Sequence, residues 1–241
     1  MSARGQTVMD FHLRIGVGML LSWVLSAQTT DWPALFTALT STDEVISGAA
    51  REKSFSTILP RLEIETPAEL DLDIQAILPA FQRTENIRLQ ASGLLTGLAV
   101  LRPDSAIALR SAIPVFLGQF KDRNARVRKN AVMAIGNLNP DPPQQALDPL
   151  AEVAQDPDGA VARFAIHGIA RLARTYDRAA AVFVKILSSN ASVETRRAAI
   201  QSMAELQLTA PLLVDQLRTI ATGDNPELTK AAKEALARMR K

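Results

Sequence analysis

Four stretches of twelve residues decide the fold, and they read VRKNAVMAIGNL (127–138), VARFAIHGIARL (161–172), TRRAAIQSMAEL (195–206) and LTKAAKEALARM (228–239). A fifth stretch, IRLQASGLLTGL (87–98), aligns with the same pattern. The small residue shared by all five lies at Ala91, Ala131, Ala165, Ala199 and Ala232, in steps of 40, 34, 34 and 33 residues. A recurring period of this length is typical of repeated supersecondary units that stack on one another.

Each stretch carries one apolar stripe. Its apolar residues fall at i, i+4, i+8 and i+11, as in Val161, Ala165, Ile169 and Leu172, which places them on one face of an α-helix. Another helical run precedes the later stretches, and the turn between the two helices is rich in residues that end one helix and cap the next. These turns are DRNA (122–125), DPDG (156–159), SNAS (189–192) and GDNP (223–226). The pattern predicts an all-α chain in which helix–turn–helix units stack into an α-solenoid.

The spacing of individual residues resembles that of HEAT repeats. Pro114 lies in a first helix, Asp122 in the turn, and Val127 and Arg128 at the start of the second helix. Later repeats keep part of this pattern, with Asp156 and Val161 in one and Asn190 and Arg196 in the next, although Ala162 stands where an Arg belongs. The resemblance covers residues 74–241 and implies a right-handed solenoid of about five clear repeats. It also implies that the residues that match the pattern, all of those named above except Ala162, form a structural ladder between repeats rather than a ligand site.

The chain is expected to divide into three parts. Residues 71–241 form the solenoid, and residues 28–70 form a divergent N-terminal cap with helices over 31–39 and 43–59. A loop is expected over residues 60–72, PRLEIETPAELDL, where a run of acids reads as solvated rather than as a catalytic carboxylate pair. These acids are Glu63, Glu65, Glu69, Asp71 and, just beyond the loop, Asp73.

Residues 1–27 have the layout of a signal peptide. The apolar run IGVGMLLSWVL (15–25) follows Arg4 and Arg14 and precedes the small residues Ser26 and Ala27. The run is shorter than the roughly 20 residues of a bilayer span. We expect a periplasmic or secreted protein of bacterial type, with no stable membrane span. Three alternatives stay open: a packed N-terminal helix in a cytoplasmic protein, an uncleaved membrane tether, and a true start at Met9.

The composition leaves little room for catalysis. The 241 residues include no Cys and two His, His12 and His167, and no HExxH, GxxxxGK or complete dinucleotide-binding motif occurs. We therefore expect no catalytic residue, no cofactor and no metal. The 27 Lys and Arg exceed the 25 Asp and Glu by two, and aromatic residues are few, so a nucleic-acid partner is not expected.

One face of the second helices is more basic than the chain as a whole. We predict that a protein partner binds there, on the concave side of the solenoid, where such folds commonly hold extended partners. The candidate contact residues are Lys129, Arg163, His167, Arg171, Arg197, Gln201 and Lys230. The alternative interpretation of these residues is a solvated helix face without a ligand.

The sequence thus predicts a non-enzymatic interaction scaffold. An enzyme or enzyme subunit is the alternative, because some HEAT-like solenoids that resemble this chain in size act as bilin lyases or, as a weaker alternative here, as alkyl-purine DNA glycosylases. The glycosylase activity needs a Trp on the concave face, whereas the two Trp residues here are Trp23 and Trp32, near the N-terminus. The identity of the partner and the oligomeric state stay open.

Overall fold

The computed structural model describes residues 30–53, 62, 65–101, 106–138, 140, 144–188 and 191–239. These residues form helices joined by turns, with no strand among them, which confirms the predicted all-α class. The predicted signal segment, residues 1–27, lies outside the described residues. Within the described part of the chain, no helix is both long and apolar enough to cross a membrane.

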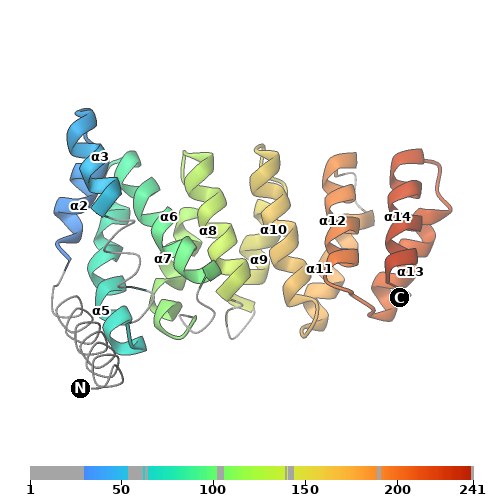
Figure 1. Ribbon diagram of the computed structural model, residues 1–241. Helices are drawn as coiled ribbons and strands as arrows, with labels where there is room; N and C mark the ends of the chain where they lie inside the picture. The colour runs from blue at the N-terminus through green and yellow to red at the C-terminus, as the bar shows by residue number, and fades with distance from the viewer. Residues whose placement is uncertain are drawn as a thin grey trace, which may run out of the picture.

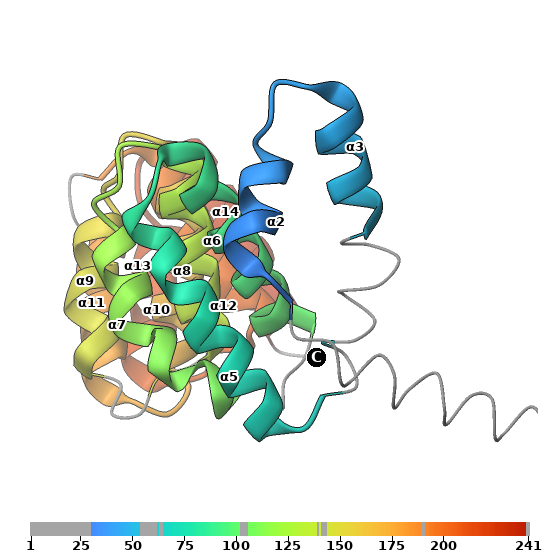
Figure 2. The same cartoon turned by 90° about the vertical axis from the view of Figure 1, so that its left-hand side faces the viewer.

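The helices stack as pairs into an elongated solenoid of two layers (Figure 1). The first-helix layer contains α5 (Pro67–Ile77) with η2 (Leu78–Gln82), η4 (Ala108–Ala112) with α7 (Ile113–Gln119), α9 (Gln144–Val153), α11 (Asp177–Ser188) and α13 (Pro211–Ala221). The second-helix layer contains α6 (Glu85–Leu101), α8 (Ala125–Leu138), α10 (Gly159–Leu172), α12 (Val193–Glu205) and α14 (Pro226–Arg238). Each second helix packs against the next one, and Figure 2 shows the two layers side by side along the stack. This arrangement is an α-solenoid, as the repeat predicts.

The apolar stripe of the second helices lies in the core. On α10, Val161, Ala165 and Ile169 are fully buried and Leu172 nearly so. Their counterparts on α8 are buried as well. Because one helix pair has little interior of its own, each stripe is covered by the neighbouring pairs, and one apolar cluster runs from the cap to α14.

Polar residues of the predicted turns start the second helices. The carboxylate of Asp158 accepts hydrogen bonds from the N–H groups of Ala160 and Val161 at the start of α10. Ser192 accepts one from Thr195 at the start of α12. These side chains satisfy backbone donors that have no partner inside the helix. The turns therefore stand where their composition predicts them.

The prediction of a loop up to residue 72 is wrong, because α5 begins at Pro67. Thr66 and Glu69 form a capping box: the Thr66 hydroxyl accepts from the Glu69 N–H at 3.4 Å, and the Glu69 carboxylate accepts from the Thr66 N–H at 2.9 Å. Pro67 occupies the first helical turn, where its missing N–H costs nothing. A domain boundary between residues 70 and 71 would fall inside this helix.

The acids of this region are only partly solvated, as predicted for Glu69, which is exposed, whereas others make contacts within the fold. Glu65 is buried, Asp73 accepts a hydrogen bond from Trp32 Nε1 at 3.0 Å, and Asp71 accepts one from the Ser111 hydroxyl at 3.4 Å. Glu63 lies outside the described residues. The carboxylates of Asp73 and Asp71 thus join α5 to the cap and to the next repeat, respectively, and the run of acids in the sequence did not indicate these contacts.

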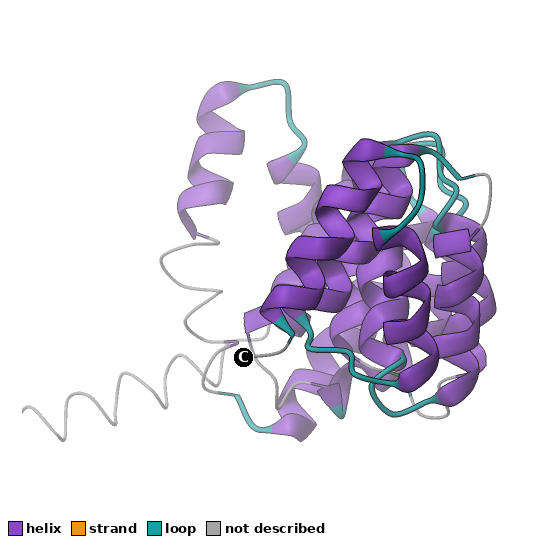
Figure 3. Cartoon of the chain, turned by 90° about the vertical axis from the view of Figure 1, so that its right-hand side faces the viewer, coloured by secondary structure: helices purple, strands orange, loops and turns teal. Residues whose placement is uncertain are grey.

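The N-terminal cap consists of α2 (Trp32–Leu39) and α3 (Glu44–Lys53). The rings of Trp32 and Phe36 stack with their centroids 5.9 Å apart, and both side chains are buried. Helix α2 contacts α5 and α6, whereas α3 packs against α2 and extends away from the layers (Figure 3). The cap therefore closes the N-terminal end of the apolar core mainly through α2.

Candidate partner-binding face

Two ion pairs connect successive second helices through the turns. Arg88 Nε lies 2.7 Å from Asp122 Oδ2, and Arg128 Nε lies 2.7 Å from Asp156 Oδ2. Hydrogen bonding to these carboxylates raises the pKa of both guanidinium groups, although burial opposes it. Burial alone would raise the pKa of Asp156, but the hydrogen bonds from Arg128 and the Asp158 N–H lower it below its usual value.

The HEAT-like spacing predicts only part of the ladder of contacts between neighbouring repeats. Arg88, the partner of Asp122, was missed, although it follows Ile87 as Arg128 follows Val127. Arg196 donates instead to the carbonyl of Leu187 at 2.7 Å, and Asn190 lies outside the described residues. The other ladder candidates have plain structural places: Pro114 is exposed in the first turn of α7, and Val127 and Val161 are buried in the core.

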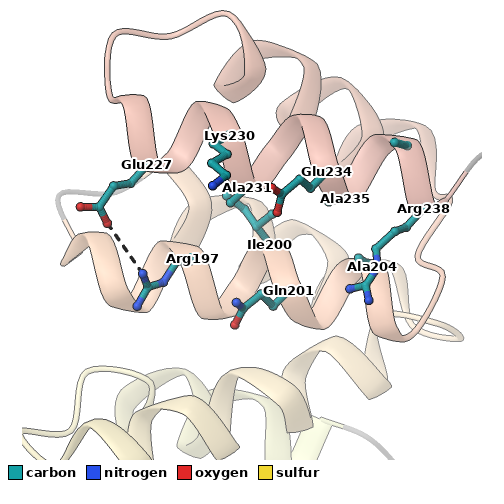
Figure 4. Close-up of a pocket in the computed structure, with 11 residues that line it drawn as sticks. Arg197, Ile200, Gln201, Ala204, Glu227, Lys230, Ala231, Glu234, Ala235 and Arg238 are labelled. Atoms are coloured by element: carbon teal, nitrogen blue, oxygen red, sulfur yellow. Dashed lines mark ion pairs between the residues drawn. The ribbon is translucent and has the colours of Figure 1, made fainter.

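A groove of about 790 Å³ lies between α12 and α14 on the exposed side of the second-helix layer. Figure 4 shows Arg197 and Gln201 on α12 and Lys230 on α14 among its lining residues. Its floor is formed by small and apolar side chains, among them Ile200 and Ala231. The groove therefore combines an apolar floor with charged and amide groups above it.

A second groove, of about 560 Å³, lies between α10 and α12. Arg163 on α10 lines this groove, and Arg197 and Gln201 line both grooves. The two grooves are therefore neighbours across α12. We call the exposed side of α8, α10, α12 and α14 the second-helix face.

Three of the predicted contact cations are exposed on this face. Arg163 is exposed, with its guanidinium carbon 5.5 Å from the centroid of the Phe164 ring. Arg197 lies 3.7 Å from Glu227, and both side chains are about half or more exposed, at 47% and 64%. Lys230 is exposed as well. An exposed ion pair contributes at most about 1 kcal/mol, so the pairing leaves Arg197 accessible to a ligand.

Three other predicted contact residues are less accessible. Arg171 is half-buried and donates to Asn137 Oδ1 at 3.1 Å, which ties α10 to α8. Lys129 on α8 is also half-buried. The His167 imidazole is half-buried, with Nδ1 4.0 Å from Glu205 Oε2 on α12. Burial, with a smaller effect of Arg171, lowers the pKa of His167, although Glu205 opposes the shift.

The face holds little chemistry beyond charge and hydrogen bonding. Among the described residues, no group of three or more His, Cys, Asp or Glu side chains could hold a metal ion. Apart from these charged groups, the titratable pair of the face is His167 Nδ1 and Glu205 Oε2, 4.0 Å apart.

Comparison with known proteins agrees with this architecture. A family model of HEAT repeats matches residues 74–170, 113–204 and 147–237, which together span most of the chain. The search of curated proteins gives no significant match.

Solved structures of repeat proteins share the fold. A designed armadillo repeat protein in complex with the peptide (KR)4 superposes with a TM-score of 0.54 at 20% identity, covering 87% of this chain and 100% of that one. An engineered protein from a structural genomics consortium gives a TM-score of 0.54 at 20% identity, covering 88% of this chain and 97% of the other. A second engineered protein from that consortium gives a TM-score of 0.54 at 16% identity, over 88% and 99% of the two chains. Together, the repeat spacing, the paired helices and the family match place this chain in the HEAT-repeat family.

Proposed function

We propose that this protein is a non-enzymatic interaction scaffold that holds a protein partner on the second-helix face. The observation that carries the proposal is the pair of neighbouring grooves between α10, α12 and α14, with Arg197 and Gln201 common to both. Two neighbouring grooves on successive repeats fit an extended chain better than a compact small molecule.

The stacked fold favours a rigid binding surface. The helices that line the grooves are anchored by fully buried residues such as Ala165, Ala199 and Ala232, so exposed side chains of successive repeats keep a constant spacing. A partner then loses its own conformational freedom, while the scaffold changes little. The designed armadillo protein among the structural neighbours was solved with a peptide, which is consistent with this mode for the fold class.

Site-specific photo-crosslinking tests the face. A photoreactive amino acid replaces Gln201, which is exposed on α12, or Gln145, which is exposed on α9 in the first-helix layer. We expect the Gln201 variant, expressed in its native host, to crosslink a discrete partner that the Gln145 variant does not capture. Equal crosslinking from both positions, or crosslinking from Gln145 alone, would contradict the assignment of the face.

We further propose that the partner meets this protein outside the cytoplasm, on the basis of the apolar run over residues 15–25 between basic and small residues. Fractionation of the native host followed by N-terminal sequencing tests this. A mature start near Gln28 in the exported fraction is the expected result. An intact N-terminus in the cytosol contradicts it.

A further inference from the structure

The second-helix face carries a regular row of positive charges. Counting two residues back from the aligned Ala of the last four repeats gives Lys129 on α8, Arg163 on α10, Arg197 on α12 and Lys230 on α14. Each is the fifth residue of its helix. Because the helices are successive members of one layer, these four side chains form a line across the repeats, which we call the cation row.

The cation row runs along the grooves. Arg163 and Arg197 line the groove between α10 and α12, and Arg197 and Lys230 line the groove between α12 and α14. Arg163, Arg197 and Lys230 are exposed, and Lys129 is half-buried at the other end of the row. A chain lying across the repeats would therefore pass one cation at each helix.

Some acids near the row make other contacts. Asp158 caps the first N–H groups of α10. Glu194 is exposed and lines the groove between α10 and α12 together with Arg163 and Arg197, and hydrogen bonding to its own N–H and to Ser192, with a smaller effect of Arg197, lowers its pKa. Glu205 faces His167, further along the helices.

Two further acids lie beside the row, in the groove between α12 and α14. Glu227 contacts Arg197 at 3.7 Å with both side chains exposed, and Glu234 lies one turn after Lys230 in the same groove. These two carboxylates offset part of the positive charge without covering it, because exposed pairs of this kind are weak and exchange readily. A ligand carboxylate can therefore replace Glu227 at Arg197.

The spacing of the row selects a ligand conformation. Neighbouring packed helices lie about 8–10 Å apart, so the aligned backbone positions that carry the cations are expected to recur at about that distance. A polyproline II segment rises about 3.1 Å per residue with three residues per turn, so its residues i and i+3 share one side and lie about 9 Å apart. In a β-strand, residues i and i+3 point to opposite sides, and residues i and i+2 are only about 7 Å apart.

We propose that the cation row binds an acidic segment of the partner in polyproline II conformation, with a carboxylate at every third residue. The proposal rests on the proposed scaffold function and names the chemistry of its partner. Each carboxylate meets one cation of the row, and the residues between them lie over the small and apolar side chains of the groove floor, such as Ala231 and Ala235. The positive charge of the cation row requires acidic residues in the segment, and the distance between repeats sets the spacing of those residues.

A direct test uses the full chain and synthetic peptides. The probe is a fluorescent peptide of Glu-Pro-Pro triplets, one triplet for each cation of the row. Its isomer has the same residues with the Glu clustered at one end, and a third peptide carries Lys in place of Glu. By fluorescence anisotropy at low salt, we expect the regular peptide to bind several-fold more tightly than the clustered isomer. The Lys peptide should bind more weakly still, and salt should weaken the binding of the regular peptide.

Two matched triple variants locate the binding. The row variant carries Arg163→Ala, Arg197→Ala and Lys230→Ala. The control variant replaces two Arg and one Lys by Ala in the first-helix layer. The control changes are Arg178→Ala, Lys185→Ala and Arg218→Ala, all at exposed positions of α11 and α13. Both variants lose two Arg and one Lys, so they have the same net charge. We expect about tenfold weaker binding for the row variant and almost none of this loss for the control.

The outcomes separate this proposal from the scaffold function. Equal binding of the clustered isomer overturns the three-residue spacing, and equal loss in both triple variants overturns the cation row. Absence of peptide binding combined with a Gln201 crosslink overturns the acidic ligand but leaves the scaffold function standing. Absence of both overturns the two proposals together. Urea unfolding of each variant shows that any loss of binding is not a loss of fold.

Discussion

At the level of single residues, the local environment decides what a side chain of a given type does. His167, with 35% of its side chain exposed, faces Glu205 from α12 and has Arg171 one turn away on its own helix. Burial, aided by Arg171 and opposed by Glu205, lowers the pKa of His167. The imidazole is therefore neutral at neutral pH, and it is a poor anion-binding residue there despite its place in the sequence pattern.

This shift predicts a pH dependence of stability. His167 binds a proton less readily in the folded state than in the unfolded state. Its contribution to the free energy of unfolding is therefore fully present above the ordinary pKa of 6.5. This contribution is lost as the pH falls from 6.5 through the lowered pKa of the folded state. We expect the urea midpoint to fall between about pH 7.5 and about pH 5.5, and His167→Gln to make that fall smaller. An identical fall in wild type and variant would contradict the assignment.

The backbone at Gln207 supports a second prediction at this level. Gln207 has φ of 52°, in the left-handed region, where it ends α12 while the Leu208 N–H bonds to the Met203 carbonyl at 3.0 Å. This geometry favours Gly over residues with a Cβ. We expect Gln207→Gly to raise the free energy of unfolding by roughly 0.5–1 kcal/mol, measured by urea unfolding.

The same change at another glutamine is the control. Gln201 lies inside α12, where Gly is less favourable than other residues. Gln201→Gly is expected to lower the free energy of unfolding by about 1 kcal/mol. Two changes of the same sign would show that the conformation at Gln207 does not limit stability.

At the level of elements, close approach of helices depends on where the glycines lie. A Cβ on Gly136 of α8 would lie 3.3 Å from the Gly168 Cα of α10, whereas a Cβ on Gly97 of α6 would meet nothing within 4 Å. Gly136 and Gly168 do not stand at aligned positions of their repeats, but they lie on neighbouring helices of the layer and each faces the other across the contact. Their small size brings α8 and α10 together near the middle of the second-helix layer.

We therefore expect opposite effects at two helical glycines. Gly136→Val forces α8 and α10 apart and should lower the free energy of unfolding by roughly 1–3 kcal/mol. Gly97→Ala adds a methyl group in open space and improves helix propensity. This variant should therefore raise the free energy of unfolding by about 0.5–1 kcal/mol. Thermal and urea unfolding of both variants check the pair. Stabilisation by Gly136→Val would contradict the close helix approach.

The helix starts show where sequence patterns were sufficient to predict the boundary of an element. The turns before α10 and α12 carry Asp158 and Ser192, and each helix starts directly after them as predicted. The start of α5 was missed although Thr66 and Glu69 have the spacing of a capping box. Two prolines and several acids in that stretch suggested a loop, but Pro67 stands at the one helical position that accepts it without loss of a hydrogen bond.

For the whole molecule, stability comes from stacking of one repeat on the next. Ile169 is fully buried on α10, a helix that packs between α8 and α12. A change there weakens contacts to the neighbouring repeats on both sides, because no repeat buries its apolar stripe alone. The ion pairs of the ladder help to orient the repeats, but the buried apolar core contributes more to the free energy of unfolding than they do.

Truncation of Ile169 tests this account. We expect Ile169→Ala to lower the free energy of unfolding by roughly 2–5 kcal/mol, with a clear fall in the melting temperature. Ile107→Ala is the matched control, because Ile107 is 66% exposed and should change stability by less than about 0.5 kcal/mol. A melting temperature unchanged by Ile169→Ala would contradict the assignment of the core stripe.

The sequence by itself determined the repeat, the helical stripe and the fold class, because helix periodicity and turn composition are local properties of the chain. Val161, Ala165 and Ile169 could be assigned to the core from spacing alone. Only the tertiary structure decided which side chains meet: that Asp122 pairs with Arg88, that Arg171 is held by Asn137, and that two grooves share Arg197 and Gln201. These contacts join residues about one repeat apart, and their geometry depends on how the helices pack, which no local pattern encodes.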